Sequence, residues 1–79
     1  MALIALKVPT LGESITEGIL DRWLVSDGAF VRRDETVCEI GTDKTTLEVK
    51  APQDGVIRVK VPAQRSVTTG EELGTLEPS

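Results

Sequence analysis

The 79-residue sequence contains no histidine and no tyrosine, and it has a single cysteine, a single tryptophan and a single phenylalanine. The absence of histidine excludes a histidine-based catalytic triad and a histidine metal site within the chain. One cysteine cannot form an internal disulfide. Because aromatic side chains are so few, the core has to be built from valine, isoleucine and leucine, and the β-branched members of this set favour strands.

Charge and hydropathy exclude further classes. The net charge is −4, and Arg32-Arg33 is the only basic cluster, which argues against a nucleic-acid-binding surface. No apolar run approaches the length of a membrane span or of a signal-peptide core. Cys38 lies in an alternating strand pattern, as a small buried thiol would, and a reducing compartment fits it. We therefore expect one small domain with a cytoplasmic location.

Alternation of apolar and polar residues predicts an all-β fold. In residues 2–8, one face carries Ile4, Leu6 and Val8. A second run covers residues 15–25, with Ile19, Trp23 and Val25 on one face and Trp23 as the large core residue. Further strands are expected at residues 30–31, 35–40, 47–51, 56–61, around 67, and 73–76. No helical period extends beyond one turn.

The two halves of the chain resemble each other. Residues 23–25 precede the similar residues 59–61 by 36 positions, whereas Glu17-Gly18 precedes Asp54-Gly55 by 37. One of the two halves therefore contains a one-residue insertion. A repeat of short strands separated by turns predicts a sandwich or flattened barrel of two short antiparallel sheets, related by a quasi-two-fold axis.

The centre of the chain predicts a hairpin with Lys44 at or next to its tip. Residues 42–46 are small and polar apart from this lysine, and both flanks alternate. The tip contains no glycine, so a type I turn is favoured over a primed one. A catalytic lysine needs burial or a cationic neighbour, and Lys44 has Asp43 instead. From the residues alone, Lys44 is either a solvated turn residue or the attachment point of a covalent group.

An ordered series of motifs resembles the lipoyl domain of 2-oxo acid dehydrogenase complexes. Its members are Val8-Pro9-Thr10-Leu11-Gly12-Glu13-Ser14, Glu17-Gly18, Trp23, Gly28, Val31, Asp43-Lys44, Glu48-Val49, Ala51-Pro52, Gly55 and Thr69-Gly70. The resemblance covers about residues 3–77. It implies a lipoyl domain over residues 1–77, with the start of an interdomain linker at residues 78–79.

The resemblance implies a swinging-arm carrier. Lys44 would hold lipoic acid in amide linkage, presented by Asp43 and Thr45. A 2-oxo acid dehydrogenase would acylate the arm reductively, coenzyme A would accept the acyl group, and dihydrolipoyl dehydrogenase would reoxidise the dithiol. A lipoyl ligase or transferase would attach the group. The acyltransferase domain of the same parent chain would complete the set of partners, and the carrier itself would hold no catalytic group.

The loop after the first strand is expected to take part in partner recognition. Its candidate residues are Leu11, Gly12, Glu13 and Ser14, with Leu11 favoured as an exposed apolar side chain. The Leu-Gly-Glu-Ser sequence favours the succinyl-transferring (2-oxoglutarate) complex and a succinyltransferase parent chain. Pyruvate and branched-chain complexes are the alternatives.

Three positions depart from the family pattern. Gly41 stands where a glutamate is frequent, Thr45 where an apolar residue or alanine is usual, and Gln64-Arg65 where Gly-Asp is frequent. The last departure is expected to give a different turn. Other readings stay open: a biotinyl carrier, which would place its lysine between two methionines, an unmodified interaction module of the same fold, and an independent enzyme.

Overall fold

The computed structural model describes residues 2–12 and 14–79, and they form eight strands. The strands are β1 (Ile4–Lys7), β2 (Glu17–Trp23), β3 (Phe30–Val31), β4 (Thr36–Gly41), β5 (Thr46–Lys50), β6 (Gly55–Val59), β7 (Arg65–Thr68) and β8 (Glu72–Pro78). The last strand is longer than the predicted residues 73–76. It continues through Pro78 because Gly55 of β6 still pairs with it there.

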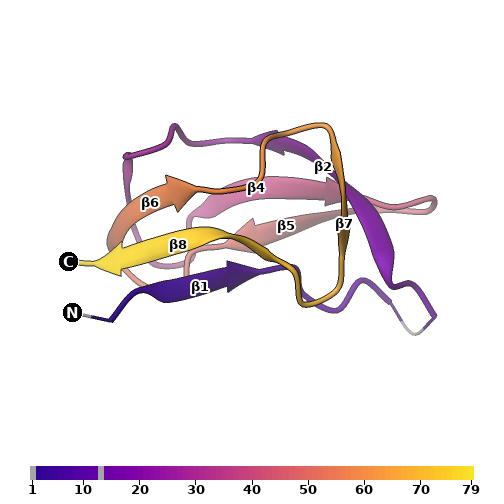
Figure 1. Cartoon of the computed structure of the whole chain (residues 1–79), viewed down its shortest axis with the longest axis horizontal. Coiled ribbons are helices and arrows are strands. Elements are labelled where there is room, and N and C mark those ends of the chain that lie inside the picture. Colours follow the sequence, from indigo (N-terminus) through magenta and orange to yellow (C-terminus); the bar gives the residue numbers. More distant parts are fainter. Residues whose placement is uncertain (1, 13) are drawn as a thin grey trace.

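The strands form two four-stranded antiparallel sheets, ordered β1-β8-β6-β3 and β5-β4-β2-β7. If each strand is replaced by the strand four places later, with β1 counted after β8, the first order becomes the second. This confirms the predicted quasi-two-fold sandwich, and the sheets do not close into a barrel. Figure 1 shows the β4–β5 hairpin at the end of the molecule opposite the start of β1 and the end of β8.

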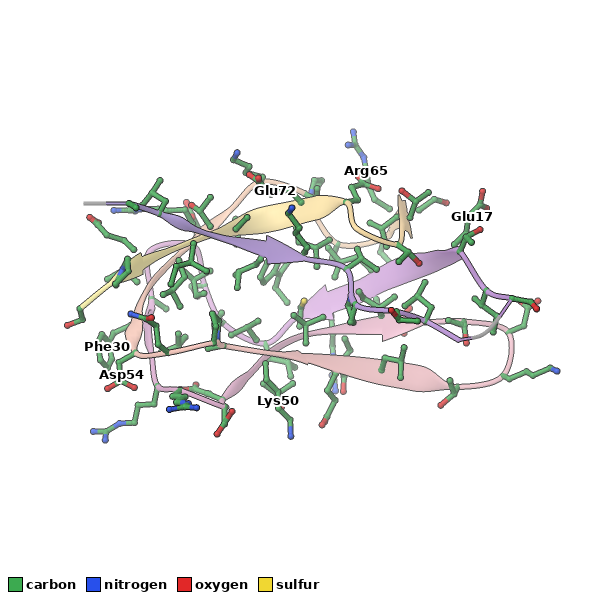
Figure 2. All side chains as sticks on the ribbon, turned by 90° about the horizontal axis from the view of Figure 1, so that it is seen from below. Glu17, Phe30, Lys50, Asp54, Arg65 and Glu72 are labelled. Atoms are coloured by element: carbon green, nitrogen blue, oxygen red, sulfur yellow. The ribbon has the colours of Figure 1, made fainter. Side chains whose placement is uncertain are left out.

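Aliphatic side chains fill the space between the sheets. Figure 2 shows them between the two layers, whereas the labelled Lys50, Arg65 and Glu72 point outward. The largest fully buried residues, drawn from both sheets, are Leu20, Ile40, Ile57, Leu73, Leu76, Val31, Val37, Val67 and Cys38. The core is aliphatic, as the shortage of aromatic residues predicted.

A β-bulge in β2 overturns one predicted strand face. The pairing of β2 with β4 shifts between Leu20 and Arg22, so an extra residue, Asp21, opposes no partner. Leu20 is completely buried and Ile19 is 48% exposed. Because the bulge changes the phase of alternation, Trp23 faces inward although Ile19 does not. The prediction that Ile19 and Trp23 share a face was therefore wrong.

The turn at Gln64 repeats the turn at Gly28. Gly28 has φ 88° and donates its N–H to Ile57 O at 2.7 Å, while Gln64 has φ 67° and donates to Leu20 O at 2.7 Å. Gln64 therefore adopts the left-handed conformation that glycine adopts at position 28. The left-handed backbone is unfavourable for a residue with a Cβ. The Gln64 side chain offsets part of this cost, since its Nε2 donates to Asp21 O at 2.7 Å.

Trp23 is half-buried rather than enclosed. It packs against the buried core, and its indole N–H donates to Val61 O at 2.8 Å.

We predict that Trp23→Ala lowers the free energy of unfolding by about 3 kcal/mol, the low end for deleting a large aromatic side chain. Trp23→Phe keeps most of the packing and should lose about 1 kcal/mol, for one hydrogen bond. Urea unfolding measures both; equal losses would contradict the assignment of most of this energy to packing.

Cys38 lies on β4 and is completely buried. Burial, with a smaller contribution from the charge of Glu39, raises the pKa of the thiol from 9.0 to about 12. The unfolded thiol ionises first, so stability is full below pH 9 and falls as the pH rises toward 12, by at most about 1.4 kcal/mol per pH unit. We predict this slope in the difference between the wild type and Cys38→Ala in unfolding experiments. A difference that is independent of pH would contradict it.

Candidate functional site

The tip of the β4–β5 hairpin is closed by two threonines. Thr42 N–H donates to Thr45 O at 2.8 Å, and the Thr42 hydroxyl donates to the same carbonyl at 3.0 Å. The Thr45 N–H in turn donates to Thr42 Oγ1 at 3.2 Å. Neither Asp43 nor Lys44 has a positive φ, so the turn is not of the primed kind. Hydrogen bonds that involve the Thr42 side chain therefore close this turn, which needs no residue with positive φ.

Lys44 lies at this tip and is exposed, as are Asp43 and Thr45. The two ion pairs seen among the described residues, Arg22–Glu39 and Lys60–Glu72, do not involve it. The strands that carry it are fixed by burial of Ile40 and Val49. The arrangement holds one amine at a defined position outside the body of the domain, which suits covalent attachment and not catalysis in a pocket.

A hollow lies beside the hairpin, between the end of β4, the start of β5 and the first part of β2. We call it the hairpin hollow. It is lined by Ile15, Glu17, Gly18, Ile19, Asp21, Gly41, Thr42, Asp43, Thr46 and Ser66. The described residues that line it include three carboxylates and no basic group, so a partner that covers the tip meets negative charge here.

The loop between β1 and β2 is at the same end of the molecule as the hairpin (Figure 1). Leu11 is only 4% exposed, so the expectation of an exposed apolar residue was wrong. It packs into the core near Gly18, at 3.4 Å from where a β-carbon at that glycine would lie. Gly12 is half-buried and Ser14 is exposed, whereas Glu13 lies outside the described residues.

Sequence reasoning missed Asp21 as a site residue. Its carboxylate lies over Gly41: a β-carbon at position 41 would be 2.7 Å from Asp21 Oδ2 and 3.2 Å from its Cγ. The Asp21 side chain, from the neighbouring strand, therefore occupies the space beside position 41 that a side chain there would need. The one-residue difference between the repeat offsets was the signal for an insertion, although it did not say which residue was inserted.

A lysine presented on the tip of a β-sandwich is the architecture of a carrier domain with a covalent prosthetic group. A protein-family model described as "Biotin-requiring enzyme", the biotin/lipoyl model, matches residues 4–76. The chain therefore belongs to the biotin/lipoyl attachment family.

The relatives are on the lipoyl side of this family. The sequence is 42% identical over 74 residues to the dihydrolipoyllysine-residue succinyltransferase component of the 2-oxoglutarate dehydrogenase complex of Rickettsia felis, covering 92% of this chain and 18% of that protein. The mitochondrial human protein of the same name is 45% identical over 75 residues, covering 94% of this chain and 16% of that protein. The chain thus spans less than a fifth of these relatives.

A solved structure shares the whole fold. The lipoyl domain of the 2-oxoglutarate dehydrogenase complex from Azotobacter vinelandii superimposes with a TM-score of 0.77 at 41% identity, covering 96% of this chain and 99% of that domain. Lipoyl domains of this kind carry covalently attached lipoic acid. The exposed amine of Lys44 fits such a group, since an amide bond needs a reachable amine and no enclosing pocket. The described residues contain no helix able to cross a membrane.

The hydroxyl of Thr42 is predicted to order the tip. Thr42→Val keeps the shape of the side chain but removes the acceptor for the Thr45 N–H, so we expect a loss of about 1 kcal/mol in unfolding free energy. Amide hydrogen exchange should show faster exchange at Thr45. Thr45→Val is the matched control, because its hydroxyl makes only a 3.5 Å contact with Thr46 O. Unchanged Thr45 protection in Thr42→Val would refute this role.

Proposed function

We propose that this domain is a swinging-arm carrier in which lipoic acid is joined to the Nζ of Lys44. The observation that carries the proposal is the position of this lysine, exposed at the tip of a hairpin whose strands are anchored in the core. Asp43 and Thr45 present it, the first as its exposed neighbour and the second by closing the turn. The matching family, whose lipoyl members carry this cofactor, supports the assignment.

The chemistry follows from the arm and not from the domain. When bound, the lipoyl group supplies a disulfide that accepts an acyl group and a dithiol that is later reoxidised. The residues of the hairpin fix the starting point of the arm, and the length of the arm allows the lipoyl group to enter the active site of another enzyme. A flexible linker after β8 would keep the local concentration of the arm high at each active site that it visits.

The 2-oxoglutarate complex is the proposed setting, because relatives that cover this chain are named as its succinyltransferase component. The partners are then a 2-oxo acid dehydrogenase, dihydrolipoyl dehydrogenase, a lipoyl ligase or transferase, and an acyltransferase domain of the parent chain. Coenzyme A is the final acyl acceptor. The buried free thiol fits a reducing compartment. The bacterial relatives support the cytoplasm as this compartment, whereas the human relative is mitochondrial.

We propose that partner proteins recognise the loop before β2 by contacting its exposed residues. Ser14 is exposed and the loop shares the hairpin's end of the molecule. Gly12 and the buried Leu11 would act by shaping this loop, with Glu13 as a further candidate.

Lipoylation in vitro tests the proposal. The domain is incubated with a lipoyl ligase, ATP and lipoate, and intact mass and peptide mapping follow the product. We expect one lipoyl group on Lys44 and none in Lys44→Ala. That variant should lose less than about 0.5 kcal/mol of stability, because an exposed turn residue buries little.

Lys50→Ala is the matched control, since Lys50 is exposed at the end of β5 that is farther from the tip, and it points outward from the sheet (Figure 2). It should be lipoylated like the wild type. Modification at another lysine, or none under conditions that lipoylate a known domain, would refute the proposal. Reductive acylation of the product by 2-oxoglutarate and by pyruvate dehydrogenases, compared directly, then tests the choice of complex.

A further inference from the structure

Asp21 has no counterpart in the second half of the chain. The offset between equivalent residues is 37 for Leu20 and Ile57 but 36 for Trp23 and Val59, so the inserted residue lies between them. The pairing of β6 with β8 runs without a shift, whereas β2 shifts against β4 at this point. The insertion is therefore a bulge in one strand only, the one beside the hairpin that carries Lys44.

Two hydrogen bonds from Gln64 to main-chain carbonyl groups hold the bulge in place. Gln64 donates its N–H to Leu20 O and its side-chain Nε2 to Asp21 O, both at 2.7 Å. These contacts use carbonyl groups and leave the Asp21 carboxylate free to lie across Gly41. Asp21 therefore lies beside Gly41 and accepts a hydrogen bond from Gln64, and both of these positions depart from the family pattern.

The Asp21 carboxylate faces the hairpin hollow, together with Thr42 and Asp43. It makes no hydrogen bond with another residue of the described chain. The adjacent Arg22 binds Glu39 instead, with 2.7 Å between Nε and Oε1. An enzyme that forms an amide at Lys44 has to cover the tip, and it would bring its own donor groups against this half-buried, uncompensated carboxylate.

We propose that Asp21 is a specificity-determining residue for the modification of Lys44. The attaching enzyme binds its carboxylate through an arginine, lysine or N–H donor, at the place that a side chain at position 41 would occupy. This inference rests on the proposed lipoylation of Lys44. It also makes positions 21 and 41 interdependent, because a glutamate at 41 meets the Asp21 carboxylate both sterically and as a like charge.

Initial rates of lipoylation by intact mass test the proposal. Asp21→Asn keeps the shape and removes the charge; we expect kcat/KM for the domain to fall about tenfold, as for the loss of one charge-assisted hydrogen bond. Glu77→Gln is the matched control, because it changes the same charge on an exposed strand residue of the other sheet. It should leave the rate unchanged. Thermal unfolding confirms that both variants remain folded.

A second pair of variants tests the interdependence. Gly41→Glu alone should lower the melting temperature, whereas Gly41→Glu combined with Asp21→Ala should restore it and recover most of the wild-type lipoylation rate. Wild-type rates for Asp21→Asn, or equal slowing by Glu77→Gln, would overturn this inference while leaving Lys44 as the attachment site. A wild-type domain that takes up no lipoyl group would overturn the proposed function as well.

Discussion

Burial of aliphatic side chains between two four-stranded sheets is the constraint on which the rest of this structure depends. A strand presents alternate residues to opposite faces, so burying one face decides what the other shows. Ile40 and Val49 bind β4 and β5 to this layer. The two strands therefore leave the sandwich in a fixed direction, and their connection can be polar, exposed and still well placed. The position of the candidate site is therefore fixed by buried residues that are not themselves part of it.

The same constraint sets the turns. Asp34 has φ 69° and Gly70, 36 residues later, has φ 87°; Gly28 and Gln64 form a second pair with positive φ. In each pair one half uses glycine and the other does not. The backbone conformation thus follows from the packing of the halves, and the non-glycine residues bear the cost of a left-handed conformation. Gln64 shows how part of that cost is offset, through its hydrogen bond to the bulge.

Much of the fold could be predicted from the sequence because periodicity and turn residues are local signals. Ile4, Leu6 and Val8 alternate without interruption, and all three face inward. Ile19 was misplaced because a bulge leaves the pattern of side-chain types intact while it reverses their direction. Leu11 was misplaced because the local sequence does not distinguish an apolar loop residue that packs into the core from one that is exposed. The position of Asp21 over Gly41 requires knowledge of which strands pair and in which register.

The pairing of strands also explains why a hairpin such as the one that carries Lys44 is present at one end of the molecule and not at the other. Under the quasi-two-fold, the equivalent of β4 and β5 is β8 and β1, which pair in the same way but are not joined. The site equivalent to the Lys44 tip is thus where β1 starts and β8 ends, at the opposite end of the molecule (Figure 1). A chain that continued beyond β8 would leave far from the lysine. The attachment point of such a tether and the Lys44 tip would therefore be separated by the length of the sandwich, which would leave the tip accessible from outside.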